Sequence, residues 1–127
     1  MEALIIPEGQ STPSISLDSD KGKIEILGNS LPEDVLGFYS PVIKWVEAYV
    51  QNPNPKTEIH IKLSYFNSSS SKSILDILSL FEELVDLNLS VEVIWHYLDL
   101  DEDMLSTGKE FESMLKMPFQ FVPFYMT

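Results

Sequence analysis

The sequence predicts an α/β fold in which three helices pack on a mixed, mostly parallel sheet with an antiparallel N-terminal hairpin. Two observations predict it. Short alternating apolar segments fill the first 30 residues, and segments with strand and helix periodicity then alternate to the end of the chain. The expected order is β-β-β-α-β-α-β-α-β, with right-handed crossovers between the parallel strands. At 127 residues the chain is expected to form one domain, residues 1–127.

Three strands are expected before the first helix, because turn-forming residues separate short apolar segments. The strands are Leu4 to Ile6, Ile15 to Leu17 and Lys23 to Leu27. The intervening DSDKG suits a hairpin connection between the second and third of them.

The first helix is expected over residues 32–51. Ser30 would cap it, Pro32 suits a first turn, and Glu33 and Asp34 favour the positive end of a helix. Apolar residues then recur at helical spacing up to the breaker NPNP.

The remaining elements follow from the same two periodicities. They are a strand around residues 59–63, an amphipathic helix over 74–85, a strand over 91–98, a helix over 104–115 and a strand over 119–124.

Composition excludes several classes of function. Twenty acidic against eight basic residues give a net charge of -12, which disfavours nucleic acid and anionic membranes as partners. No apolar run reaches the length of a membrane span, and the first residues do not resemble a secretion signal, so a cytoplasmic location is expected. The absence of cysteine excludes disulfides and thiolate chemistry.

Four consecutive serines, Ser68 to Ser71, lie between an expected strand end and a helix start. Free backbone amides and the helix dipole favour an anion there. One reading is simple capping by one serine. The other is a phosphorylation switch, since a phosphate would add about -1.5 to -2 charge at the helix tip. Lys72 is near enough in sequence to steady a phosphate, or is an ordinary solvated lysine.

Other candidate sites have simpler interpretations. Asp99, Asp101, Asp103 and Glu110 imitate the spacing of a calcium-binding loop, but Met104 occupies the position that needs glycine. These acids are better explained as favouring a helix N-terminus.

The two histidines, His60 and His96, fall in expected strands without a paired ligand at metal spacing, so each is interpreted as structural. No catalytic set or nucleotide-binding motif occurs. We therefore expect a protein that is not an enzyme and that needs no cofactor or metal.

Several segments together resemble one known family. STPSISLD, LPEDVLGFYSPVIKWVEAYV, YFNSSSSKSILDIL, VIWHY and PFQF resemble the SiaC family of bacterial regulatory phosphoproteins, which act in biofilm and c-di-GMP signalling. The resemblance covers nearly the whole chain. It is most specific where an Asn precedes a run of small hydroxyl residues and a lysine. The arrangement is also similar to that of anti-sigma factor antagonists with the STAS fold.

The resemblance implies a phosphoacceptor at the hydroxyl after that Asn. This position is Ser68, with Asn67, Ser69, Ser70, Ser71 and Lys72 forming the supporting loop. It further implies three partners: a Ser/Thr protein kinase with a histidine-kinase-like ATPase fold, a PP2C-type phosphatase, and a diguanylate cyclase bound by the unphosphorylated form.

The leading hypothesis is a non-catalytic partner switch, in which phosphorylation at Ser68 breaks contact with a target enzyme. One alternative is a constitutive protein adaptor that uses its serines only as a cap. Another is a small-molecule-binding domain with its pocket at the carboxyl ends of the strands.

Overall fold

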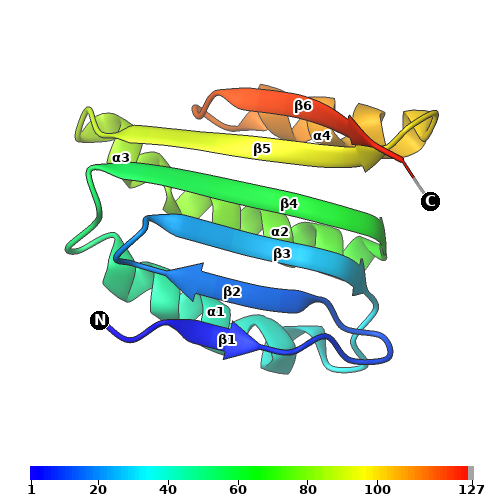
Figure 1. The fold of residues 1–127 in the computed structure, drawn as a ribbon, viewed down its shortest axis with the longest axis horizontal. Helices are drawn as coiled ribbons and strands as arrows, with labels where there is room; N and C mark the ends of the chain where they lie inside the picture. Colours follow the sequence, from blue (N-terminus) through cyan, green and yellow to red (C-terminus); the bar gives the residue numbers. More distant parts are fainter. Residues whose placement is uncertain (126–127) are drawn as a thin grey trace.

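Six strands form one mixed sheet in the computed structural model, which describes residues 1–125. The strands lie in the order of the sequence (Figure 1). They are β1 (Leu4–Ile6), β2 (Ser14–Asp18), β3 (Lys23–Ser30), β4 (Lys56–Phe66), β5 (Ser90–Leu98) and β6 (Phe119–Phe124). The first three pair antiparallel and each later strand adds in parallel, which confirms the predicted α/β class.

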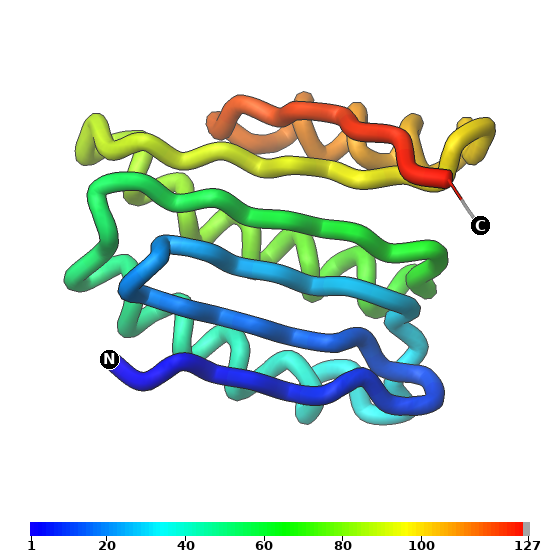
Figure 2. The backbone as a smooth tube through the Cα atoms, viewed as in Figure 1, coloured from blue at the N-terminus to red at the C-terminus, as the bar shows by residue number. Residues whose placement is uncertain are grey.

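All the helices of the described chain lie on one face of this sheet, as the ribbon and the tube both show (Figures 1 and 2). They are α1 (Val35–Tyr49), α2 (Ser68–Leu80), α3 (Glu82–Asp86) and α4 (Glu102–Met114). The opposite face carries no helix. Within residues 1–125, none of these helices has the length and apolar character that crossing a membrane requires.

The start of α1 differs from the prediction. The helix begins at Val35, and its cap is Asp34, whose Oδ1 accepts a hydrogen bond from the Gly37 amide at 3.0 Å. Ser30 is not the cap. It ends β3, which runs three residues beyond its predicted end, and its side chain is fully buried.

The second predicted helix begins earlier and is divided. α2 starts at Ser68, so the four serines form its first turn instead of a loop before it. It ends at Leu80, and the buried Phe81 separates it from the short α3, which ends at Asp86. Helical periodicity of apolar residues detected only the part that packs on the sheet, from Ile74 onward.

The core lies between the sheet and the helices. Alternate residues of each central strand point into it, as the burial of Ile59, Ile61 and Leu63 in β4 shows. Buried apolar residues of α2 cover them, so the strand period of two and the helix period of 3.6 meet in one apolar layer.

Leu78→Ala tests this layer. Leu78 is fully buried on α2, so truncation should leave a cavity and lower the free energy of unfolding by about 2–5 kcal/mol. Urea unfolding measures the change. An unchanged midpoint would show that the face of α2 is misassigned.

Gly108→Ala tests the packing of α4 on the sheet. A Cβ at this position would lie 2.6 Å from Nε1 of Trp95, a fully buried ring that donates to the Met104 carbonyl at 3.1 Å. Alanine normally stabilises a helix relative to glycine, by about 0.5–1 kcal/mol. Here overpacking should reverse the sign and destabilise by about 1–3 kcal/mol. The exposed Ser106→Ala on the same helix is the control, and a more stable Gly108→Ala would contradict the packing.

Candidate functional site

Asn67 fixes the junction between β4 and α2. Its side-chain Oδ1 accepts from the Ser70 amide at 2.9 Å, and its carbonyl accepts from the Ser71 amide at 2.9 Å. Its own amide donates to the Ser30 carbonyl at the end of β3. An asparagine is a preferred N-cap because a short side-chain oxygen satisfies an amide of the first turn. The start of α2 is therefore tied both to its own cap and to the neighbouring strand.

A buried hydrogen-bond network lies directly beneath this turn. Ser70 Oγ donates to the Ser30 carbonyl at 3.0 Å, and Ser30 Oγ donates to Ser70 Oγ at 2.9 Å. The Tyr39 hydroxyl of α1 lies 2.5 Å from Ser30 Oγ. Burial raises the pKa of the Tyr39 phenol, although its bond to Ser30 opposes the effect, so the phenol keeps its proton. All three side chains are fully buried.

The four serines consequently point in different directions. Ser70 points into the protein, whereas Ser68 and Ser69 are exposed. Ser68 lines a shallow hollow beside α4, together with Glu110 and Phe111. Ser71, which is partly buried, lines the same hollow.

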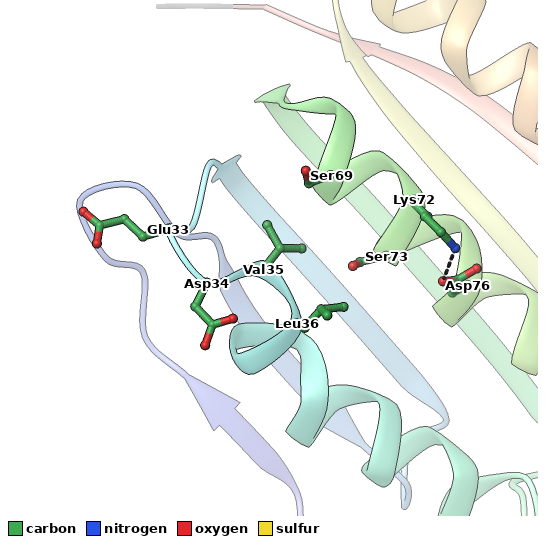
Figure 3. Close-up of a pocket in the computed structure, with 8 residues that line it drawn as sticks. All are labelled: Glu33, Asp34, Val35, Leu36, Ser69, Lys72, Ser73 and Asp76. Atoms are coloured by element: carbon green, nitrogen blue, oxygen red, sulfur yellow. Dashed lines mark hydrogen bonds and ion pairs between the residues drawn. The ribbon is translucent and has the colours of Figure 1, made fainter.

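Ser69 lies on the other side, in a groove between α1 and α2 with a volume of about 460 Å³. Figure 3 shows Val35 and Leu36 from the start of α1 facing Ser69 and Ser73 of α2. The Leu36 side chain is 77% exposed, although it is large and apolar. The groove thus combines hydroxyl groups with an uncovered apolar side chain.

Lys72 also faces this groove. Its Nζ lies 3.2 Å from Asp76 Oδ2, one helical turn along α2, and both side chains are mostly exposed (Figure 3). Lys72 therefore has an acidic partner already, and it lines a different hollow from Ser68. The sequence grouped Lys72 with the serines but could not tell on which side of the helix it lies.

One residue of the acidic segment 99–103 caps the helix α4. Asp101 caps this helix, because its Oδ1 accepts from the Met104 amide at 3.0 Å. Glu102 and Asp103 occupy the first helical turn, as the interpretation of a favoured helix N-terminus expects. In the part of the chain that the structure describes, no three His, Asp or Glu side chains gather into a metal-binding group.

The two histidines are closer together than the sequence indicated. His60 of β4 alternates with the buried Ile59 and Ile61, so it lies on the face opposite the core. Its Nδ1 is 3.0 Å from Nε2 of His96 in β5. The sequence offered only one signal for this pair: both histidines fall in predicted strands. The strand register decided the contact. His96 pairs with Lys62, so it lies diagonally across from His60, which is two residues before Lys62 on the same face of β4.

Known proteins resemble this chain in sequence and in fold. The model of the SiaC family of regulatory phosphoproteins matches residues 6–124. An uncharacterised protein of Pseudomonas aeruginosa strain UCBPP-PA14 is 35% identical over 119 residues, which cover 94% of each chain.

Two crystal structures from Pseudomonas aeruginosa are also similar. Apo-SiaC has a TM-score of 0.87 at 34% identity and covers 96% of this chain and 99% of its own. A chain of the complex between the diguanylate cyclase SiaD and its activator SiaC has a TM-score of 0.89 at 34% identity, covering 95% and 99%. With a family model that spans the fold and relatives above 30% identity along nearly the whole length, this chain belongs to the SiaC family of regulatory phosphoproteins.

Proposed function

We propose that this protein is a non-catalytic partner switch, controlled by reversible phosphorylation of Ser68. The unmodified form binds and activates a diguanylate cyclase, and the phosphorylated form does not. The observation that carries the proposal is the exposure of Ser68 at the capped N-terminus of α2, directly after Asn67.

Accessibility supports Ser68 over two of its neighbours as the phosphoacceptor. A kinase must take the hydroxyl into its own active site, which excludes the fully buried Ser70 and disfavours the partly buried Ser71. Ser69 is exposed, as Ser68 is, but it faces the groove between α1 and α2. The resemblance to the family distinguishes these two, because its acceptor immediately follows the Asn.

The charges around Ser68 support a disruptive effect of phosphate. Its hollow contains the carboxylate of Glu110 and no basic residue among the groups that line it. Lys72 lines the groove on the other side and is paired with Asp76. A phosphate here gains from the helix dipole but remains outward-facing, so it would meet a docked partner directly.

The same arrangement leaves the fold itself undisturbed. Ser68 makes no part of the buried network, which uses Ser30, Ser70 and Tyr39. A charged group forced into an interface without a cation costs several kcal/mol, whereas the same group at an exposed helix N-terminus is tolerated. Phosphorylation should therefore act on binding and not on folding.

Partners follow from the family and from the surface. The SiaC of Pseudomonas aeruginosa is an activator of the diguanylate cyclase SiaD, and we assign a cyclase of this kind as the target here. The exposed Leu36 and the groove beside Ser69 would supply its apolar contact. A Ser/Thr kinase with a histidine-kinase-like ATPase fold and a PP2C-type phosphatase would set the state of Ser68.

Phosphate mapping tests the acceptor. After incubation with the cognate kinase and ATP, intact-mass and peptide mass spectrometry should find one phosphate, on Ser68. Ser68→Ala should abolish it, while Ser69→Ala, a matched change at the adjacent exposed serine, should retain it. A phosphate that maps to Ser69 or elsewhere would refute the assignment.

Binding of the cyclase tests the consequence. Ser68→Asp, or the phosphorylated protein, should bind at least about tenfold more weakly than the wild type, which is about 1.4 kcal/mol. Ser79→Asp adds the same charge at the exposed far end of α2 and should leave the affinity unchanged. Calorimetry measures both. Equal binding by the Ser68→Asp and phosphorylated forms and by the wild type would favour the constitutive adaptor instead.

A further inference from the structure

The face of the sheet that no helix covers carries a second cluster, separate from the serines. His60 and His96 project from neighbouring strands, and their facing nitrogens, Nδ1 and Nε2, lie 3.0 Å apart. The rings are nearly parallel, at 23°, with centroids 5.3 Å apart. Both side chains are partly exposed, so the pair is accessible from solvent.

Glu58 holds the first ring in a defined state. Its Oε1 lies 3.0 Å from His60 Nε2, and the bond lowers the pKa of the Glu58 carboxyl, which is therefore an ionised acceptor. In the neutral imidazole Nε2 then carries the proton, and the lone pair on Nδ1 faces His96 Nε2 at 3.0 Å. A carboxylate on the far nitrogen of a histidine is the usual partner that orients a metal-binding imidazole.

The spacing of the two nitrogens suits a shared ion. Imidazole nitrogens bind divalent transition-metal ions at about 2.0–2.1 Å. Two nitrogens that occupy adjacent, right-angle positions on one ion are then about 3.0 Å apart. Right-angle positions are typical of the tetragonal geometry of Cu²⁺ and Ni²⁺. In such an arrangement each metal–nitrogen bond lies about 45° from the line that joins the two nitrogens, so both rings must rotate away from their present hydrogen bond.

We propose that His60 and His96 form a binding site for one divalent transition-metal ion of the Cu²⁺ and Ni²⁺ class, with Glu58 as the positioning residue. In the hydrogen-bonded pair the one ring proton of neutral His96 lies on Nε2. On binding, this proton is lost to solvent while Nδ1 takes one up from solvent, so the ring stays neutral and Nε2 is free to ligate. The ion takes the place of the hydrogen bond between the rings. Since no third protein ligand gathers there within residues 1–125, water fills the remaining positions.

The surrounding charges set how protons compete with the ion. Burial lowers the pKa of His96, a protonated His60 and the ammonium of Lys62 would lower it further, and Glu25 opposes them. A histidine must be neutral at the ligating nitrogen, so protons compete with the ion for both rings. Lys62, whose ammonium lies 4.8 Å from the Phe124 ring centroid, disfavours a cation nearby, and Glu25 and Glu58 favour it. Acidification should release the metal.

Calorimetric titration of the untagged protein with Ni²⁺ and Cu²⁺ tests the site, with Mg²⁺ as the negative control. Saturable binding of one ion is expected at pH 7.5 and at least tenfold weaker binding at pH 5.5. His60→Gln and His96→Gln should each weaken it at least tenfold. Glu58→Gln should weaken it about tenfold or more while leaving one ion per chain. Circular dichroism checks that each variant is folded.

Proton NMR locates the ion independently. These are the only two histidines of the chain, so the two variants assign their imidazole signals, and Cu²⁺ should broaden both together. Absence of saturable binding by the wild type would overturn the proposal. So would binding that persists in the double variant, or broadening of only one ring.

Discussion

The buried hydrogen bonds among Ser30, Ser70 and Tyr39 are the constraint on which the serine site depends. They join the end of β3, the first turn of α2 and the middle of α1 at one point inside the protein. Once Ser70 is held inward, the helical rotation of about 100° per residue forces Ser68 and Ser69 outward on different sides. A run of four identical residues is thereby divided among the buried network, which holds Ser70, the groove toward α1, which Ser69 lines, and the hollow beside α4, which Ser68 and Ser71 line.

The second constraint is the placement of every described helix on one face of the sheet. It buries alternate strand residues such as Ile59 and Ile61, and it leaves the residues between them, such as the partly exposed His60, on the other face. Polar side chains on that face stay in contact with water, so they lose little hydration free energy, and they can form hydrogen bonds with their neighbours. Glu58, His60 and His96 do so as a hydrogen-bonded row across β4 and β5.

Regulation by phosphate fits the electrostatics of the whole molecule. A protein with a net charge of -12 gains little attraction for a further anion from its general field. The effect of the proposed phosphate on Ser68 would then be local, acting through the N-terminus of α2 and the proposed interface around it. Among the described residues, no basic side chain lines the hollow at Ser68, and Lys72 is paired with Asp76.

The sequence by itself determined the class of fold, the order of the elements and the location of the serine cluster, because periodicity and capping residues are local signals. It did not reveal that Ser30 belongs to β3 and bonds to Ser70, forty residues away, since a buried polar pair leaves no periodic trace. It also treated His60 and His96 as unrelated residues. Only the register of β4 against β5 and the one-sided packing of the helices brought these rings together, because contacts between strands depend on the pairing of distant segments.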